Sequence, residues 1–84
     1  MSVDLSSLKP DKVVDARGTA CPGPLLEAKR AIADLAPGAI LEVQSSDEGT
    51  NDDLPLWAEN AGHDFLGVIE EAGFWRLFVK KAEE

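Results

Sequence analysis

The sequence predicts an α/β (α+β) fold: a two-layer sandwich with the order β-α-β-α-β-β, in which two helices cover one face of a four-stranded mixed sheet. Two stretches with apolar residues at three- and four-residue spacing, typical of helices, each follow a short stretch rich in β-forming residues. Two further β-rich stretches, joined by a tight turn, follow the second helix. The 84 residues have room for one domain, and a hydrophobic content of 44 % suffices for a modest core.

The first strand is expected around Val13 and Val14 and ends at Arg17-Gly18. The first helix is expected from Pro22, because proline suits the first turn of a helix, where its missing N–H would have had no partner. An apolar stripe then continues through Leu25, Ala28, Ile32 and Leu35. Pro37-Gly38 predicts the end of this helix.

The second strand is predicted over 39–45 by the alternation of apolar and polar residues, and a turn over 46–50 follows it. The apolar stripe of the second helix consists of Leu54, Trp57, Ala58 and Ala61. Pro55 leaves two starts open: a kinked helix from Thr50, or a regular helix from near Asp53. Gly62 is expected to cap its C-terminal end.

The last two strands are predicted over 65–70 and 74–80, with a hairpin turn at 71–73. Trp75, Leu77 and Val79 share one face of the last strand. Phe74 and Phe78 lie on the other face beside charged residues and are expected to be half exposed. This second sheet face is either an ordinary mixed surface or a contact face for a partner.

Residues 1–12 are expected to form a loose lead-in, 13–80 a single domain and 81–84 a C-terminal tail. The chain has 16 acidic and 8 basic residues, a formal charge of −8, which argues against nucleic acid as the main partner. The charge favours either solubility or a partner with a basic docking face. Without an apolar stretch long enough for a signal peptide or a membrane span, a cytoplasmic location and no membrane partner are expected.

Cys21 is the single cysteine, so no internal disulfide and no cysteine-rich zinc site is expected. It directly precedes Pro22-Gly23-Pro24, at the predicted start of a helix. The partial positive charge of a helix N-terminus favours the reactive thiolate over the thiol. We predict that the thiolate is stabilised by backbone N–H groups of Cys21, Gly23 and Leu25 and by nearby Arg17. The alternative is a small buried cysteine without chemistry.

His63 is the single histidine, and no motif ties it to Cys21. A solvated or capping role is favoured over that of a catalytic base. The acidic cluster Asp47, Glu48, Asp52 and Asp53 lacks the spacing of a calcium loop, so we expect it to stabilise a helix start. No metal site is predicted, and no phosphate-binding or dinucleotide motif indicates a cofactor.

The segments Asp15-Ala16-Arg17-Gly18 and Cys21-Pro22-Gly23-Pro24-Leu25-Leu26 together resemble the signature of the TusA (SirA-like) family of sulfur carrier proteins. The resemblance extends over about 13–80 and includes Pro37-Gly38, Ser46-Asp47, Asp53-Leu54-Pro55 and Ala61-Gly62-His63. It implies the same two-layer sandwich.

The resemblance also implies that Cys21 accepts sulfur as a persulfide from a donor and passes it to an acceptor protein. Donors in the family are rhodanese-like proteins or cysteine desulfurases, and acceptors include DsrE-like proteins. Members that serve tRNA thiolation often carry basic residues near the second helix start, where this chain has Asp52 and Asp53. Inorganic sulfur metabolism is therefore favoured over tRNA thiolation.

Several points stay open at this stage. They are a sulfurtransferase activity at Cys21, a monomer or a weak oligomer, and sulfur or selenium as cargo. Two other function classes also remain: a non-covalent regulatory or interaction module that docks through the second sheet face, and a single-cysteine redox enzyme.

Overall fold

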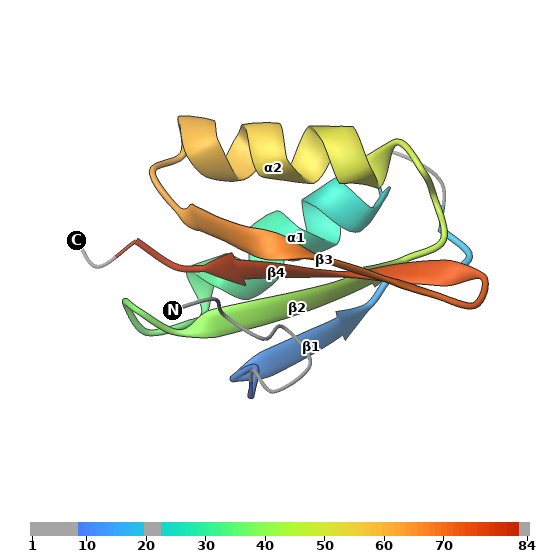
Figure 1. Cartoon of the computed structure of the whole chain (residues 1–84). Helices are drawn as coiled ribbons and strands as arrows, with labels where there is room; N and C mark the ends of the chain where they lie inside the picture. The colour runs from blue at the N-terminus through green and yellow to red at the C-terminus, as the bar shows by residue number, and fades with distance from the viewer. Residues whose placement is uncertain (1–8, 20–22, 83–84) are drawn as a thin grey trace, which may run out of the picture.

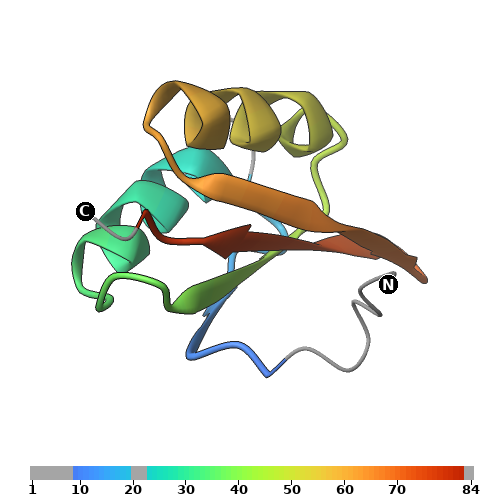
Figure 2. The same cartoon turned by 60° about the vertical axis from the view of Figure 1, so that its left-hand side comes forward.

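The computed structural model describes residues 9–19 and 23–82, and the predicted two-layer sandwich is confirmed. Its elements in chain order are β1 (Lys12–Asp15), α1 (Gly23–Ala33), β2 (Ile40–Ser45), α2 (Thr50–Asn60), β3 (Asp64–Glu71) and β4 (Phe74–Lys80). The strands form one sheet in the order β1-β2-β4-β3, with both helices on the same face (Figures 1 and 2). β1 is parallel to β2, and the other neighbouring strands are antiparallel.

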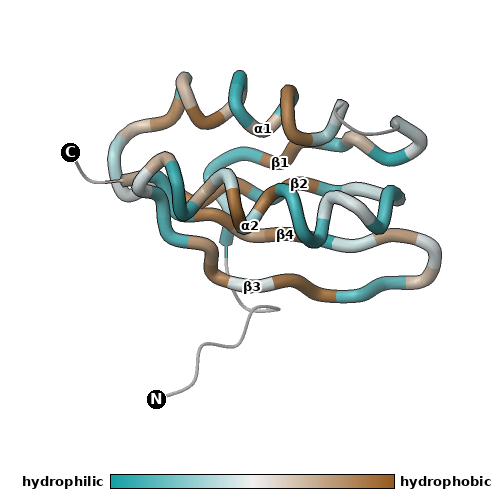
Figure 3. The backbone as a smooth tube through the Cα atoms, turned by 90° about the horizontal axis from the view of Figure 1, so that it is seen from above, coloured by the Kyte–Doolittle hydropathy of each residue, from teal (hydrophilic) through white to brown (hydrophobic). Residues whose placement is uncertain are grey.

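The core lies between the sheet and the helices. Its strand side is formed by fully buried apolar residues of the two central strands, Leu41, Val43, Leu77 and Val79. Its helix side is formed by Ala28, Ala31 and Ile32 of α1 and by Leu54 and Ala58 of α2. Small alanines let α1 approach the sheet closely, and each buried leucine or valine contributes about 1.5–3 kcal/mol. Figure 3 shows hydrophobic residues recurring along the helices and the strands beneath them.

Helix α1 ends at Ala33, so the prediction that it continues to Pro37-Gly38 was wrong. The N–H groups of Asp34 and Leu35 each donate to a carbonyl three residues back, at 3.1 and 3.2 Å. This tightens the chain into a single 3₁₀-like turn after the α-helix. Leu35 still packs against the core, which explains why it continued the apolar stripe in the sequence.

Helix α2 begins at Thr50, the first of the two predicted starts, and Pro55 lies inside it. It runs as one continuous helix in Figure 1. The predicted cap at Gly62 is confirmed, because this residue has φ +84°. The His63 N–H donates to the Ala58 carbonyl at 2.8 Å, and the Gly62 N–H to the Glu59 carbonyl at 3.2 Å. These two bonds form a Schellman motif.

The second sheet face, away from the helices, differs from the expectation at one residue. Phe74 is partly buried, as expected, but Phe78 is fully buried. Phe78 lies on an interior strand, and the Arg76 guanidinium lies over its ring, 5.3 Å from the centroid. Arg76 Nη2 also pairs with Glu42 Oε1 at 3.1 Å, and Gln44 Nε2 donates to Glu42 Oε2 at 2.7 Å.

Glu42 is thus a buried carboxylate within a hydrogen-bonded network. Burial alone would raise the pKa of Glu42, but the hydrogen bonds from Arg76 and Gln44 together hold that pKa below its ordinary value. The neighbouring Arg76–Glu71 contact, at 3.4 Å, extends the network to the outer strand β3. Polar pairs of this kind are stable in partial burial only when their donors and acceptors are matched.

Both edges of the sheet are short or irregular. β1 has four residues and carries a charged residue at each end, Lys12 and Asp15. β3, the opposite edge strand, has a β-bulge between Phe65 and Gly67, where its register with β4 shifts. Such features interrupt the row of unpaired backbone groups that an edge strand presents.

Candidate functional site

The site predicted from the sequence lies at the end of the sheet that holds the C-terminal ends of β1 and β2. Because β1 and β2 are parallel, the segments that follow them leave the sheet at the same end of the strands, where α1 and α2 also begin (Figure 1). Cys21 belongs to the first of these segments. Cys21 and Pro22 lie outside the described residues, so the geometry is built from their neighbours.

The chain before Cys21 is attached to β2 and to the segment that follows it. The Ala16 N–H donates to the Gln44 carbonyl at 2.9 Å, and the Gly18 N–H donates to Ser46 Oγ at 2.8 Å. The Thr19 N–H then turns back to the Ala16 carbonyl at 3.2 Å. Gly18 has φ +80°, a conformation that favours glycine.

The two residues that flank the cysteine at a distance of two positions, Thr19 and Gly23, lie against each other. A Cβ atom at Gly23 would overlap the Thr19 methyl group. Glycine therefore allows the first turn of α1 to approach the preceding chain this closely. Both ends of the segment that contains Cys21 are fixed relative to each other.

The first turn of α1 is anchored in the interior. Pro24 is fully buried, and Leu25 is partly buried and packs against the core. The turn carries no acidic residue, whereas α2 has Asp52 and Asp53 in its first turn. The partial positive charge at the start of α1 is therefore not compensated within its own first turn. The predicted N–H donation from Gly23 and Leu25 to the thiolate stays a prediction.

Arg17 is held on the second sheet face rather than left free. Its Nε donates to Asp15 Oδ1 at 2.9 Å and its Nη2 to Asp15 Oδ2 at 3.0 Å, and its guanidinium lies 5.0 Å from the centre of the Phe74 ring. Hydrogen bonds from the Arg17 side chain and backbone lower the pKa of Asp15 to about 2, and the side-chain bond raises the pKa of Arg17. The predicted support of the Cys21 thiolate by Arg17 stays a prediction. The charge of Arg17 is already paired with that of Asp15.

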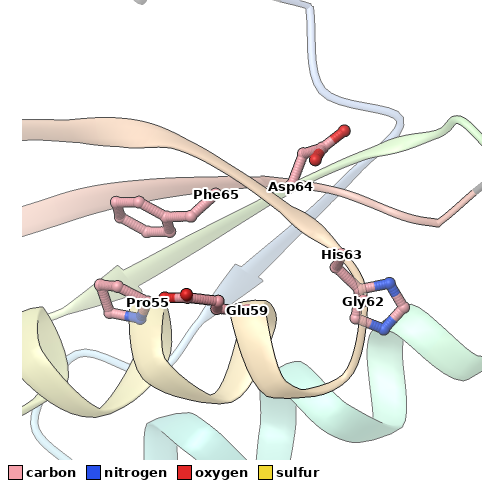
Figure 4. Close-up of a pocket in the computed structure, with 6 residues that line it drawn as sticks. All are labelled: Pro55, Glu59, Gly62, His63, Asp64 and Phe65. Carbon is pink, nitrogen blue, oxygen red and sulfur yellow. The ribbon is translucent and has the colours of Figure 1, made fainter.

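His63 lies at the opposite end of the molecule, after the C-terminal end of α2. Its Nδ1 accepts a hydrogen bond from the Ala82 N–H at 2.9 Å, and its ring lies 5.5 Å from that of Trp57. Figure 4 shows the surface depression beside it, about 550 Å³, lined by Pro55, Glu59, Gly62, His63, Asp64 and Phe65. This depression is remote from Thr19 and Gly23. His63 thus ties the chain after β4 to the α2–β3 connection.

Two features near the cysteine were missed from the sequence. The sequence placed Ser46 in a turn and among the residues that resemble the TusA family, but its contact with Gly18 becomes visible only once β1 and β2 are known to be parallel. The second feature is a groove of about 300 Å³ between the helices, lined by Leu25, Lys29, Asp53, Leu56, Trp57 and Asn60. Leu56 and Leu26 are 60 % and 48 % exposed, so the outer surface of the helices presents apolar side chains.

Within residues 9–19 and 23–82, no group of three histidine, cysteine or acidic side chains could hold a metal ion. Of the acidic residues near the start of α2, Asp47 stabilises the turn that precedes the helix, since its Oδ1 accepts the Gly49 N–H at 3.0 Å. No helix in the same ranges is long and apolar enough to span a membrane.

Comparisons with known proteins agree on one family. The family model described as Sulfurtransferase TusA matches residues 12–81. A protein of Archaeoglobus fulgidus, provisionally named a sulfur carrier protein, is 46 % identical over 69 residues, which cover 82 % of this chain and 94 % of that protein. The sulfur carrier protein TusA of Pseudomonas aeruginosa is 35 % identical over 71 residues, which cover 84 % of this chain and 90 % of the relative.

The same fold is found in a solved structure. The crystal structure of a SirA-like protein from Desulfitobacterium hafniense superimposes with a TM-score of 0.76 at 26 % identity. The match covers 86 % of this chain and 99 % of that one.

Proposed function

Because this chain belongs to the TusA family of sulfur carrier proteins, we propose that Cys21 accepts a sulfane sulfur as a persulfide and transfers it to an acceptor protein. The observation that carries the proposal is the fixed geometry on both sides of the single cysteine. Thr19 and Gly23 are in contact, and α1 begins at Gly23 with no acidic residue in its first turn.

The chemistry consists of two thiolate attacks. The Cys21 thiolate attacks the outer sulfur of a donor persulfide, R–S–SH, so that a new S–S bond forms and the donor leaves as the thiolate R–S⁻. An acceptor thiolate then attacks the outer sulfur of the Cys21 persulfide, and Cys21 leaves as a thiolate. A low pKa of the Cys21 thiol would assist both steps, because it raises the thiolate fraction and improves the leaving group. With a single cysteine, no second thiol of the chain can discharge the persulfide as a disulfide.

The donor is a rhodanese-like protein or a cysteine desulfurase, and the acceptor is a DsrE-like protein. The groove between α1 and α2, with exposed Leu26 and Leu56, supports docking of a protein partner next to the helix start that follows Cys21. Asp52 and Asp53 at the start of α2 favour a partner with a basic surface. They also favour inorganic sulfur metabolism over tRNA thiolation. The carrier acts in the reducing cytoplasm, as a monomer or weak oligomer.

Intact-mass measurement tests the proposal directly. The protein is incubated with a rhodanese-like enzyme and thiosulfate, or with a cysteine desulfurase and cysteine. We expect a gain of one sulfur atom that is absent in Cys21→Ser, is reversed by a reducing agent, and disappears when a DsrE-like acceptor is added. No gain in mass, or an equal gain in Cys21→Ser, would refute the proposal.

The same samples separate the two other function classes. A single-cysteine redox enzyme would consume peroxide with an external thiol, at a rate that depends on Cys21. A non-covalent module would keep its function in Cys21→Ala and lose it on substitution of the second sheet face. Phe78 is fully buried, so Phe74 is the better residue for that comparison.

A further inference from the structure

Ser46 connects the two chain segments that follow β1 and β2 at the end of the sheet where the candidate site lies. It directly follows β2 and is exposed, and its Oγ accepts the Gly18 N–H at 2.8 Å, across 28 positions of sequence. Gly18 precedes Cys21 by three residues. The contact therefore links the segment that leads into the thiol to the segment that leads into α2.

The Ser46 side of this contact is built on a closed turn. The neighbouring Ser45 hydroxyl lies 2.9 Å from Thr50 Oγ1 and accepts the Asp47 N–H at 3.1 Å. Asp47 in turn accepts the Gly49 N–H through its carboxylate, and its carbonyl accepts the Thr50 N–H at 3.1 Å. Ser45 therefore closes the turn, and Ser46 is free to bond to the neighbouring segment from a fixed position.

The Gly18 side depends on this bond. Gly18 lies between two backbone hydrogen bonds, of Ala16 to Gln44 and of Thr19 to Ala16. Its own N–H, in a left-handed turn with φ +80°, points to Ser46. Without the hydroxyl this N–H would turn to water, and the chain that leads to the cysteine would keep only the bond of the Ala16 N–H to Gln44 in β2. The depression of about 310 Å³ at this point is lined by Gly18, Thr19, Ser46 and Asp47.

We propose that Ser46 is a positioning residue for sulfur transfer at Cys21, acting through its hydrogen bond to Gly18. The inference rests on the proposed function and identifies a residue outside the cysteine motif on which its rate depends. Loss of a hydrogen bond that orients a reacting group costs roughly two- to tenfold in rate. Sulfur capacity, which depends only on the presence of the thiol, is unaffected.

The test uses the whole chain with Ser46→Ala, with Ser46→Thr as the variant that keeps the hydroxyl. Asp11→Ala is the matched control, because Asp11, which is also exposed, accepts the Ile40 N–H through its Oδ2 at 2.8 Å, at the opposite end of β2. Both alanine variants remove one side-chain acceptor from a distant backbone N–H. Three quantities are compared: the free energy of unfolding, the rate of sulfur uptake by intact mass, and the rate of alkylation of Cys21 by iodoacetamide against pH.

We expect the two alanine variants to lose similar stability. Only Ser46→Ala should take up sulfur roughly two- to tenfold more slowly and shift the pH profile of alkylation, and Ser46→Thr should restore both. Unchanged uptake and alkylation in Ser46→Ala, or equal slowing in Asp11→Ala, would overturn the positioning role alone. Failure of the unaltered protein to take up sulfur would instead refute the proposed function, and this inference with it.

Discussion

Substitution of Gly23 by alanine should disturb the site through a single contact. An added Cβ would overlap the Thr19 Cγ2 methyl and lie 3.3 Å from Thr19 Cβ. Gly23 lies in α1 and is not among the glycines with positive φ, so the alanine meets no backbone strain there. Alanine gains up to about 1 kcal/mol of helix propensity over glycine, whereas overpacking costs about 1–3 kcal/mol. We therefore expect a net loss of roughly 1 kcal/mol in the free energy of unfolding.

The same overlap displaces Thr19 from the start of α1, and Cys21 lies between the two residues. We therefore expect sulfur uptake by Gly23→Ala to slow roughly fivefold, which corresponds to about 1 kcal/mol in the activation barrier for a misplaced reacting group. Thr19→Ser removes the overlapping methyl and keeps the hydroxyl. The double variant should thus recover both quantities, with a coupling free energy of about 1–2 kcal/mol.

The assay combines urea unfolding with intact-mass measurement of sulfur uptake for the four proteins of the cycle: unaltered, each single variant, and the double variant. Gly49 has φ −60°, and a Cβ added there would come no nearer than 3.4 Å to a neighbouring atom, so Gly49→Ala controls for glycine replacement without an overlap. The reasoning is refuted if Gly23→Ala takes up sulfur at the normal rate. It is equally refuted if Thr19→Ser leaves the defect of Gly23→Ala unchanged.

Three further predictions concern charge and surface. With a folded pKa of about 2 against an ordinary 3.8, the Asp15 carboxylate should stabilise the fold fully above pH 3.8 and lose this contribution as pH falls toward 2. Carboxyl NMR titration of Asp15 checks the sign, and in Arg17→Ala, which keeps only the backbone N–H bond, the pKa of Asp15 should rise toward its ordinary value. Arg76→Met should lower the free energy of unfolding by about 2–3 kcal/mol, because the Glu42 carboxylate, 4 % exposed, loses its charged partner. In urea unfolding, adding Glu42→Gln should recover part of this loss, and no recovery would contradict the ion-pair explanation. Leu56→Ser should change stability by less than about 0.5 kcal/mol while slowing transfer to a DsrE-like acceptor; equal transfer rates would exclude the α1–α2 groove as the docking surface.

The order of elements followed from the sequence, because the apolar stripes and the hairpin are local patterns that survive in the fold. The end of α1 did not, since Leu35 is apolar for a reason unrelated to helix formation: it packs on the core from a turn. Pro55 could not decide the start of α2 by itself. Pro55 is the sixth of the eleven residues of α2, and burial of Leu54 and Ala58 on either side of it favours the longer helix.

Side-chain partners that come from distant strands were beyond local reasoning. The burial of Phe78 depends on its place on an interior strand and on Arg76, and the position of Arg17 over the Phe74 ring depends on where β4 lies relative to β1. The cysteine motif was visible because its residues are contiguous. The contact between Ser46 and Gly18 was not, because it exists only through the parallel register of β1 and β2.

The two edge strands affect how other proteins can bind to the sheet. β3 has a bulge, and β1 has four residues with a charged residue at each end. Neither border of the sheet offers a long straight ladder to which a foreign strand could add. Pairing with other copies of the chain, or with partners that bind by adding a strand, is therefore disfavoured at both edges of the sheet. Under the proposed function, this leaves recognition of donor and acceptor to side chains on the outer helices.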